Sequence, residues 1–265
     1  MIGVFTKYSQ NFPCLFTNGK FFLRLLIGRL CIIATIERRS AILQFRHEVK
    51  HEISNHDMLI LRQRLRAVMQ PDSHAVNGQY EIRSLYFDNI QDKALREKLD
   101  GVNIREKYRI RLYNHDHSMI SLERKFKHGS LGYKTSANLT KEQAQAIADG
   151  DVEWMPYSND EVILGFYTRM KNEGLKAKVI VDYIREPFIF APGNVRVTLD
   201  YNIRTSMSCT DFLNPDCVTV PIKDSPCILE VKWDNYLPDV IRDAVQLDGR
   251  RSGAFSKYAA SRMYD

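Results

Sequence analysis

Four short stretches of the sequence place charged residues two positions apart, with apolar residues between them. They read Glu48-Val49-Lys50, Lys107-Tyr108-Arg109-Ile110-Arg111, Glu123-Arg124-Lys125-Phe126-Lys127 and Glu230-Val231-Lys232. Because successive side chains of a β-strand point to opposite faces, each stretch lines one face with charge and packs the other into a core. Exposure to water does not by itself require a face made almost wholly of Lys, Arg and Glu. We therefore expect these strands to face one another and to concentrate cations around a polyanion.

The cations in these stretches suit phosphate recognition in two ways. Forked guanidinium donors come from Arg109 and Arg111, and point charges come from Lys50, Lys107, Lys125 and Lys127. Buried together without an anion they would repel one another, and a polyphosphate ligand would remove that cost. Three carboxylates remain as hard oxygen ligands for Mg²⁺ or Mn²⁺, namely Glu48, Glu123 and Glu230.

Two later strand-like segments add candidates by the same alternation. Tyr183 and Arg185 share one face of their strand. In the next strand Arg196 and Asp200 share a face, and Arg204 joins them if the strand contains no bulge. We expect Asp200 to pair with an arginine rather than to bind a metal.

The net charge of the chain is misleading as an average. Of the formal +6, residues 1–40 contribute +5 and the remaining residues only +1. A nucleic-acid-binding domain normally carries a basic excess throughout, so we expect no nucleic-acid partner. The five cysteines show neither a CxxC pair nor zinc-ligand spacing, which indicates reduced thiols in a cytoplasmic protein.

Residues 1–40 differ from the rest of the chain. Their apolar segment, 21–36, is interrupted by Arg24 and Arg29 and falls short of the ~20 residues that span a bilayer. We favour a non-domain extension, with membrane association through residues 1–40 as the alternative, followed by one domain over residues 43–262.

Strand and helix signals alternate after residue 43. Strands are predicted over 45–53, 80–87, 106–113, 119–127, 178–185, 195–202 and 228–233. Helices are predicted over 55–69, 90–99, 159–172 and 256–262, and also after the capping box of Thr140 and Gln143 and after Pro238. Strands dominate and helices are inserted between them, so we predict an α+β fold with an antiparallel sheet.

The order of these motifs resembles the polyphosphate-polymerase domain of the vacuolar transporter chaperone (VTC) family, a branch of the triphosphate tunnel metalloenzymes. The resemblance is carried by FRHEVKHEIS, SLYFDN, KYRIRLY, LERKFK, VRVTLDYNIRT, ILEVKW and SKYAASR, and it covers about residues 43–262. The superfamily signature is E-x-E-x-K; Arg46 stands at its first acidic position here, as the VTC branch favours. The chain looks like the stand-alone bacterial form. The resemblance implies a closed, eight-stranded antiparallel β-tunnel with a C-terminal helix.

The resemblance and the alternation together divide the candidate site residues into three groups. Catalytic roles are expected for Lys50, Arg109, Arg111, Lys125 and Lys257. Substrate binding is expected of Lys107, Lys127, Lys134, Tyr183, Arg185, Arg196, Arg204, Lys232 and Ser256. The resemblance implies that Glu230 is the main metal ligand, and Glu48 and Glu123 are further candidates.

The activity that the resemblance implies is metal-dependent phosphoryl transfer in a cationic tunnel, with Mn²⁺ or Mg²⁺ as cofactor. We expect polyphosphate synthesis from ATP, with ATP and inorganic polyphosphate or pyrophosphate as partners. A triphosphatase in the same tunnel is the first alternative, and a non-catalytic polyphosphate-binding module is the second. The presence of Glu230 favours an enzyme over a module.

Overall fold

The computed structural model describes residues 46–263, apart from 130, 225, 248 and 250–252. By its internal contacts the chain divides into residues 1–43 and residues 44–265, and the described residues all belong to the second unit. The extension predicted over residues 1–40, with its alternative of membrane association, lies outside the described residues. Within the described part of the chain, no helix is long and apolar enough to cross a membrane.

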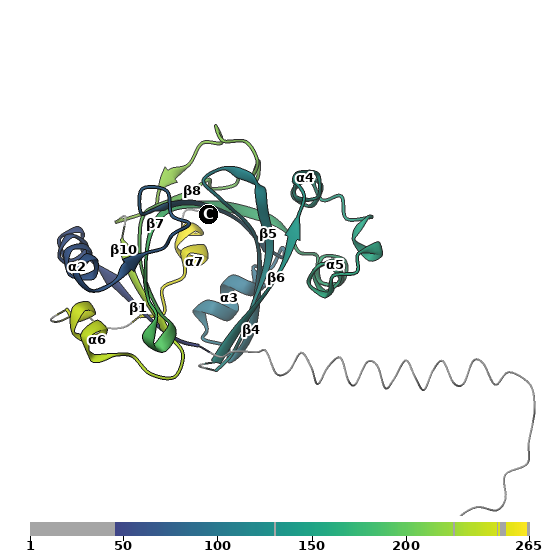
Figure 1. Ribbon diagram of the computed structural model, residues 1–265. Coiled ribbons are helices and arrows are strands. Elements are labelled where there is room, and N and C mark those ends of the chain that lie inside the picture. The colour runs from purple at the N-terminus through teal and green to yellow at the C-terminus, as the bar shows by residue number, and fades with distance from the viewer. Residues whose placement is uncertain (1–45, 130, 225, 248, 250–252, 264–265) are drawn as a thin grey trace, which may run out of the picture. The chain divides into compact units, whose positions relative to one another are not determined.

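The described residues fold around one antiparallel sheet that curls about an interior space, which we call the lumen (Figure 1). Along the sheet the strands are β1 (His47–Ile53), β10 (Cys227–Trp233), β8 (Val195–Thr205), β7 (Lys176–Phe190), β3 (Tyr80–Asp88), β4 (Ile104–Tyr113), β5 (Asp116–His128) and β6 (Leu131–Leu139). Two short strands are added at the sides, β2 (Gln70–Pro71) on β7 and β9 (Val220–Pro221) on β8. The α+β class and the antiparallel sheet of eight main strands are thus confirmed.

The prediction of a closed barrel is wrong. β1 and β6 end the order of the sheet, and no ladder of backbone hydrogen bonds joins them among the described residues. A side-chain ion pair links β1 to β5 instead, because Lys125 Nζ lies 3.1 Å from Glu48 Oε2. Strands joined by a ladder lie ~4.8 Å apart, less than the reach of a Lys–Glu pair. Residue alternation reports which way side chains point, and it carries no information about whether the first and last strands meet.

Helices cover the outside of the sheet and enter its lumen. On one side lie α2 (Asn55–Val68) and α6 (Asp239–Val245), and on another lie α4 (Lys141–Asp149) and α5 (Glu161–Glu173). Inside the curl lie α3 (Lys93–Leu99) and α7 (Lys257–Ser261) (Figure 1). Two turns of 3₁₀ helix, η1 (Met155–Tyr157) and η2 (Pro192–Asn194), complete the elements.

Local sequence signals explain where these helices start and stop. Ser54 and Asp57 form a reciprocal capping box at the start of α2, and Thr140 and Gln143 form another at α4. Gly174 ends α5 in the left-handed conformation, with φ of 67°. These boundaries agree with the prediction to within one or two residues.

Three clusters of buried side chains hold the sheet in its curl. One packs β3, β4 and β5 against α4 and α5 and includes Tyr108, Ile147 and Phe166. A second packs β1, β8 and β10 against α2 and α6. The third, which includes Tyr86, Tyr183 and Tyr258, joins β3 and β7 to α7 inside the curl. The lumen is therefore part apolar and part polar, and the polar part contains most of the candidate site residues.

One long strand was missed in the sequence. No strand was predicted between residues 127 and 178, whereas β5 and β6 form a hairpin paired from Ile120 and Leu139 to His128 and Leu131. The β6 segment LGYKTSANL contains small and polar residues in place of an alternating apolar pattern, so its strand signal is weak.

Candidate functional site

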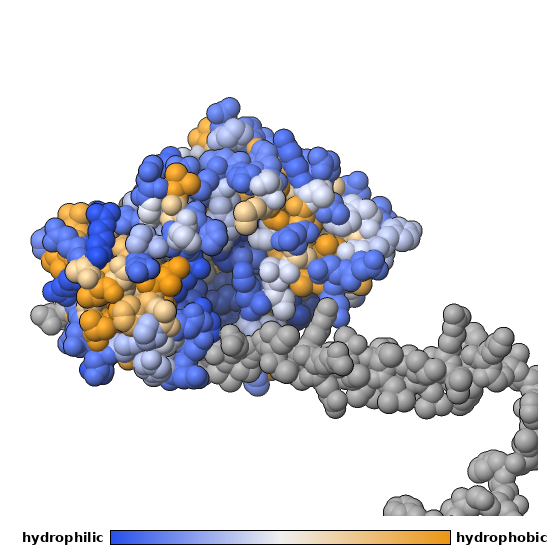
Figure 2. Space-filling model, viewed as in Figure 1, coloured by the Kyte–Doolittle hydropathy of each residue, from blue (hydrophilic) through white to orange (hydrophobic). Residues whose placement is uncertain are grey.

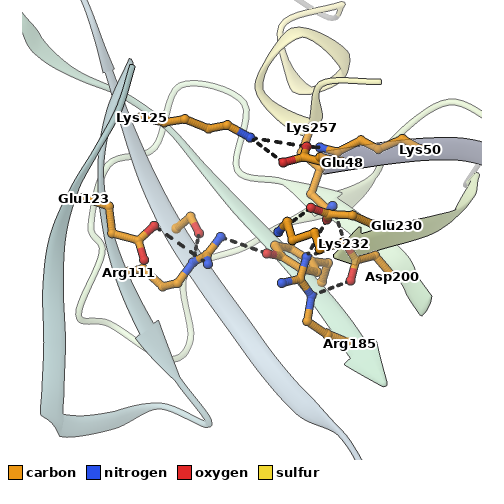
Figure 3. Close-up of polar contacts among 12 residues, drawn as sticks. Glu48, Lys50, Arg111, Glu123, Lys125, Arg185, Asp200, Glu230, Lys232 and Lys257 are labelled. Carbon is orange, nitrogen blue, oxygen red and sulfur yellow. Dashed lines mark hydrogen bonds and ion pairs between the residues drawn. The ribbon is translucent and has the colours of Figure 1, made fainter. Parts of the chain in front are cut away.

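The first polar surface of the lumen, which we call the mixed wall, carries both signs of charge. Its members are Glu48 and Lys50 of β1, Glu230 and Lys232 of β10, and Asp200 of β8. Strand register places Lys50 directly opposite Glu230 and Glu48 directly opposite Lys232. Opposite charges thus face one another across the β1–β10 pair, as Figure 3 shows.

Arg185 of β7 and Lys257 of α7 bind the carboxylates of the mixed wall. Arg185 holds Asp200 with both prongs of its guanidinium, at 2.6 and 2.8 Å, and its Nη2 also lies 3.3 Å from Glu230 Oε2. Lys257 Nζ lies 2.5 Å from Asp200 Oδ2, and Lys232 Nζ lies 2.5 Å from Glu230 Oε1. Asp200 is fully buried and pairs with an arginine, as expected.

Neighbouring cations keep these carboxylates ionised despite burial. Burial and the nearby Glu230 push the pKa of Glu48 upward, but Lys50, Lys125 and Lys232 outweigh them and lower it to about 2. Burial likewise opposes ionisation of Glu230, and Lys232, Lys50 and Arg185 hold its pKa well below the usual range. Reciprocally, the pKa of Lys50 is raised: burial opposes this, and Glu230 and Glu48 prevail.

The second polar surface, which we call the cationic wall, is built by β4, β5 and β6. It consists of Lys107, Arg109, Arg111, Glu123, Lys125 and Lys134. Glu123, which is 3% exposed, is its one carboxylate. Arg109 Nη2 lies 2.6 Å from Glu123 Oε2, and Lys134 Nζ lies 2.9 Å from Glu123 Oε1. Arg111 Nη1 lies 3.8 Å from Glu123 Oε2, so three positive charges surround one negative charge.

Hydroxyl groups hold the two arginines of the cationic wall in place. Arg109 Nη1 donates to the Tyr86 hydroxyl at 3.1 Å. Arg111 donates to the Tyr183 hydroxyl at 3.0 Å and to Ser84 Oγ at 3.3 Å. Hydroxyl partners carry no charge, and the two arginines share the single carboxylate of Glu123 with Lys134, so the group keeps a net attraction for an anion.

Beside the cationic wall, four cations gather without a carboxylate. This cation rim consists of Lys98 of α3, Arg105 and Lys107 of β4, and Lys127 of β5. Among the described residues, none of the four has a carboxylate within ion-pair distance. Lys107 Nζ donates to Ser256 Oγ at 3.1 Å and lies over the ring of Tyr258. Burial first, and then the charges of Lys98 and Arg105, lower the pKa of Lys107 to about 7.

A cavity of about 160 Å³ adjoins the cation rim between α3, β4 and α5. Its lining carries both signs of charge and some apolar surface: the cations are Lys93, Arg105, Lys107 and Arg169, the carboxylates are Asp88, Glu97, Glu106 and Glu173, and the apolar surface includes Tyr108 and Phe126. The space-filling view shows a hollow at the centre of this face, where hydrophilic side chains gather (Figure 2). The four side chains of the rim are each partly exposed, so solvent reaches them.

Two of the residues predicted by alternation do not join these walls. Arg204 bonds to Thr219 because β8 gains an extra residue at a bulge: Asp182 pairs with Arg204 but Ile184 pairs with Tyr201, and Asn202 has φ of 50°. Because the strand does contain a bulge, Arg204 does not share the face of Asp200. Arg196 keeps that face, opposite Lys232 in the strand register, but its charge is paired with Asp72 at 3.1 Å and contacts no carboxylate of either wall.

The structure also adds residues that the sequence reading missed. Arg105 shares the face of Lys107, and strand alternation would have found it had the strand been started at Ile104. Lys98 comes from a helix inside the curl, and Tyr86 and Ser84 serve as hydroxyl acceptors. Only the tertiary arrangement of α3 and β3 brings these side chains to the lumen.

The carboxylates fit a divalent metal only in company with a ligand. No group of three or more His, Cys, Asp or Glu side chains that could hold a metal occurs among the described residues. Mg²⁺ is commonly bound by one or two carboxylates together with substrate phosphates. Glu230 and Glu48 fit that pattern, because they lie near enough for each charge to affect the other. Glu123 lies on the opposite wall, bound to Arg109 and Lys134.

Solved structures with a similar chain path come from several microorganisms. A proposed adenylate cyclase of Bacillus halodurans is 14% identical, with a TM-score of 0.44 over 71% of this chain and 80% of that one. A proposed adenylate cyclase of Vibrio parahaemolyticus is 12% identical, with a TM-score of 0.40 over 76% and 82%. A protein of Pyrococcus horikoshii is 12% identical, with a TM-score of 0.38 over 76% and 84%. No curated protein matches the chain significantly.

The family model of the VTC domain matches residues 45–264, which is nearly the whole of the described chain. This is the family indicated by the charged motifs of β1, β4, β5 and β10, whose side chains line the two walls. The chain therefore belongs to the VTC domain family.

Proposed function

We propose that this chain transfers phosphoryl groups from a triphosphate bound in the lumen, and that it makes polyphosphate from ATP. The observation that supports the proposal most is the excess of cations. The cationic wall and the cation rim together hold eight positive side chains and one carboxylate, Glu123, and of the eight only Lys125 is also paired with a carboxylate of the mixed wall, Glu48, among the described residues. Such an arrangement is costly without an anion and favourable with a polyanion.

Positioning and charge stabilisation are the means of catalysis in this proposal. Arg109 and Arg111 hold the phosphates of the donor with forked hydrogen bonds, and Lys50 and Lys125 add point charges from two sides of the lumen. A terminal phosphate oxygen of the acceptor attacks in line with the departing group. That oxygen is already ionised, so no general base is required.

Glu230 and Glu48 are the residues that would hold Mn²⁺ or Mg²⁺. The metal would supply positive charge that neutralises the charge developing on the phosphates during transfer. Arg185 and Lys232 keep Glu230 ionised and oriented toward the lumen. The mixed wall thereby presents a carboxylate oxygen at physiological pH.

Product analysis distinguishes the proposal from its alternatives. Purified protein is incubated with ATP and Mn²⁺ or Mg²⁺, and the products are separated on a gel that resolves polyphosphate by length. Long chains would support polymerisation. Free phosphate without chains would identify a triphosphatase, and unchanged ATP with retained polyphosphate binding would identify a binding module.

Substitutions then assign the activity to the lumen. Lys50→Ala, Arg109→Ala and Glu230→Ala should each abolish turnover, while thermal melting shows that the fold is retained. Polymer yield like that of the unaltered protein from all three variants would refute the proposed site.

A further inference from the structure

A loop on the outside of the sheet brings two thiols together. It connects β8 to β9 and covers residues 206–219. Cys209 Sγ lies 3.0 Å from Cys217 Sγ, about 1 Å more than the length of a disulfide bond. Cys209 is exposed, whereas Cys217 is buried against the α4–α5 side of the core. An oxidant can therefore reach the first thiol and, through it, the second.

The backbone of the loop holds both thiols at this separation. The Cys209 amide donates to the Ser206 carbonyl at 3.1 Å, and the Cys217 amide donates to the Asn214 carbonyl at 3.3 Å. Between them Phe212 is fully buried in the core. The approach of the two sulfur atoms is thus built by turns and packing.

The same loop is tied to the sheet by a buried ion pair. Arg83 on β3 binds Asp182 on β7 with both prongs, each at 2.9 Å, and donates to the Asn214 carbonyl of the loop. These contacts keep the loop in place while its thiols react, so a bond between the sulfur atoms requires little movement of the backbone.

We propose that Cys209 and Cys217 are a redox-active pair that forms a reversible disulfide. The oxidant is a low-molecular-weight disulfide. The Cys209 thiolate attacks one sulfur of that molecule and releases one thiol, which leaves Cys209 in a mixed disulfide. The Cys217 thiolate then attacks the sulfur of Cys209 and releases the second thiol. The two protons lost by the cysteines are taken up by the two leaving thiolates, so two cysteines are oxidised and one small disulfide is reduced.

Two features set the order of these steps. Exposure makes Cys209 the thiol that meets the oxidant. Burial, together with the adjoining Cys209, raises the pKa of the Cys217 thiol, so Cys217 is not the thiol that reacts first, and its position 3.0 Å from Cys209 Sγ makes it the resolving partner. Cysteine spacing alone indicated reduced thiols, whereas the structure brings two of the thiols close enough to react with each other.

Thiol mapping of the full-length chain tests the proposal. The protein is equilibrated with mixtures of reduced and oxidised glutathione, quenched with acid, alkylated and digested, and its peptides are identified by mass. We expect a Cys209–Cys217 cross-link that increases with oxidised glutathione and disappears with excess reductant. Cys227 is the internal control: it is buried, bonds to Asn55, and should remain a free thiol.

Two single variants make the result specific. Cys217→Ser should trap Cys209 as the mixed disulfide with glutathione, and Cys209→Ser, at the exposed position, should leave Cys217 reduced. The proposal is overturned if Cys209 of the unaltered chain stops at the mixed disulfide, or if it cross-links to a cysteine other than Cys217.

Discussion

The two walls of the lumen belong to one sheet and yet differ in electrostatic balance. On the mixed wall the carboxylates Glu48, Glu230 and Asp200 each contact at least one cation. On the cationic wall Glu123 serves three cations, and the neighbouring rim has no carboxylate at all. The mixed wall is nearly compensated without a ligand, whereas the cationic wall is not. In the proposed function this difference favours the first wall for the metal and the second for the phosphates.

Two lysines show this contrast within a single residue type. Burial lowers the pKa of both Lys50 and Lys107, but Glu230 and Glu48 reverse the effect on Lys50 and raise its pKa. Lys107 faces Lys98, Arg105, Lys125 and Lys50, and its pKa falls to about 7. A lysine of the cationic wall is therefore poised to gain charge when an anion binds.

The largest effect is expected from removing the charge of the mixed wall. Glu230→Gln should lower turnover by at least about 10²-fold, because it removes the main metal ligand and leaves Lys232 and Arg185 without their shared partner. Initial rates measured over a range of Mn²⁺ concentrations should show that the variant needs more metal.

Glu123→Gln is the matched change on the cationic wall. It should disorder Arg109 and Lys134 and lower turnover by roughly 10-fold to 10²-fold, as loss of a supporting contact does. Its dependence on Mn²⁺ should be unchanged. A shift in metal dependence equal to that of Glu230→Gln would indicate that the metal lies between the walls. It would contradict the proposal that the mixed wall alone holds the metal.

The next effect concerns affinity for phosphate. Arg111→Met should weaken binding of tripolyphosphate by about 10-fold to 10²-fold, since a charged, forked hydrogen bond to an anion contributes about 1.5–3 kcal/mol. Isothermal titration calorimetry without metal measures this. Because no metal is present, Glu230→Gln should bind tripolyphosphate at least as tightly as the unaltered protein, and equal losses in both variants would contradict the division of roles.

A smaller effect should appear in the pH dependence of binding. Above pH 7 the free protein loses the proton of Lys107, whereas bound triphosphate favours the charged lysine and raises its pKa. Binding therefore takes up a proton, and affinity should fall with rising pH by at most about tenfold per unit for this one group. Calorimetry in buffers of different ionisation enthalpy counts the protons. Lys107→Met should reduce the uptake, and an unchanged count would exclude Lys107.

The same group affects stability with the opposite sign. The unfolded chain, in which the pKa of lysine is 10.5, binds more protons than the folded chain above pH 7. The contribution of Lys107 to the free energy of unfolding should therefore rise from pH 7 to about 10.5.

The smallest effect is expected at Arg204. Its side chain bonds to Thr219 and contacts neither wall, so Arg204→Ala should change turnover and tripolyphosphate affinity by less than about twofold. A tenfold loss of either would show that the bulge at Asn202 does not separate Arg204 from the site.

Alternation along strands predicted which side chains share a face, but not where strands bulge or which strands lie side by side. It correctly grouped Tyr183 with Arg185 and Arg109 with Arg111, because a period of two is a local property of the backbone. It could not detect the bulge that turns Arg204 away or the weakly marked strand that presents Lys134. The partners of Arg111, namely Ser84 and Tyr183, come from strands far apart in sequence, and only their pairing in the sheet reveals them.

The gap between β1 and β6 has a consequence for a long product. A polymer that passes through a closed ring is threaded, and it can leave only when one end is drawn through. In this sheet no backbone ladder joins β1 to β6 among the described residues, and β1 is linked to β5 by the Lys125–Glu48 pair, whose side chains are 49% and 27% exposed. Exposed pairs of this kind contribute about 0.2–1 kcal/mol, far less than a ladder of backbone hydrogen bonds. If the chain makes polyphosphate as proposed, the product would therefore leave through the side of the molecule, whatever its length.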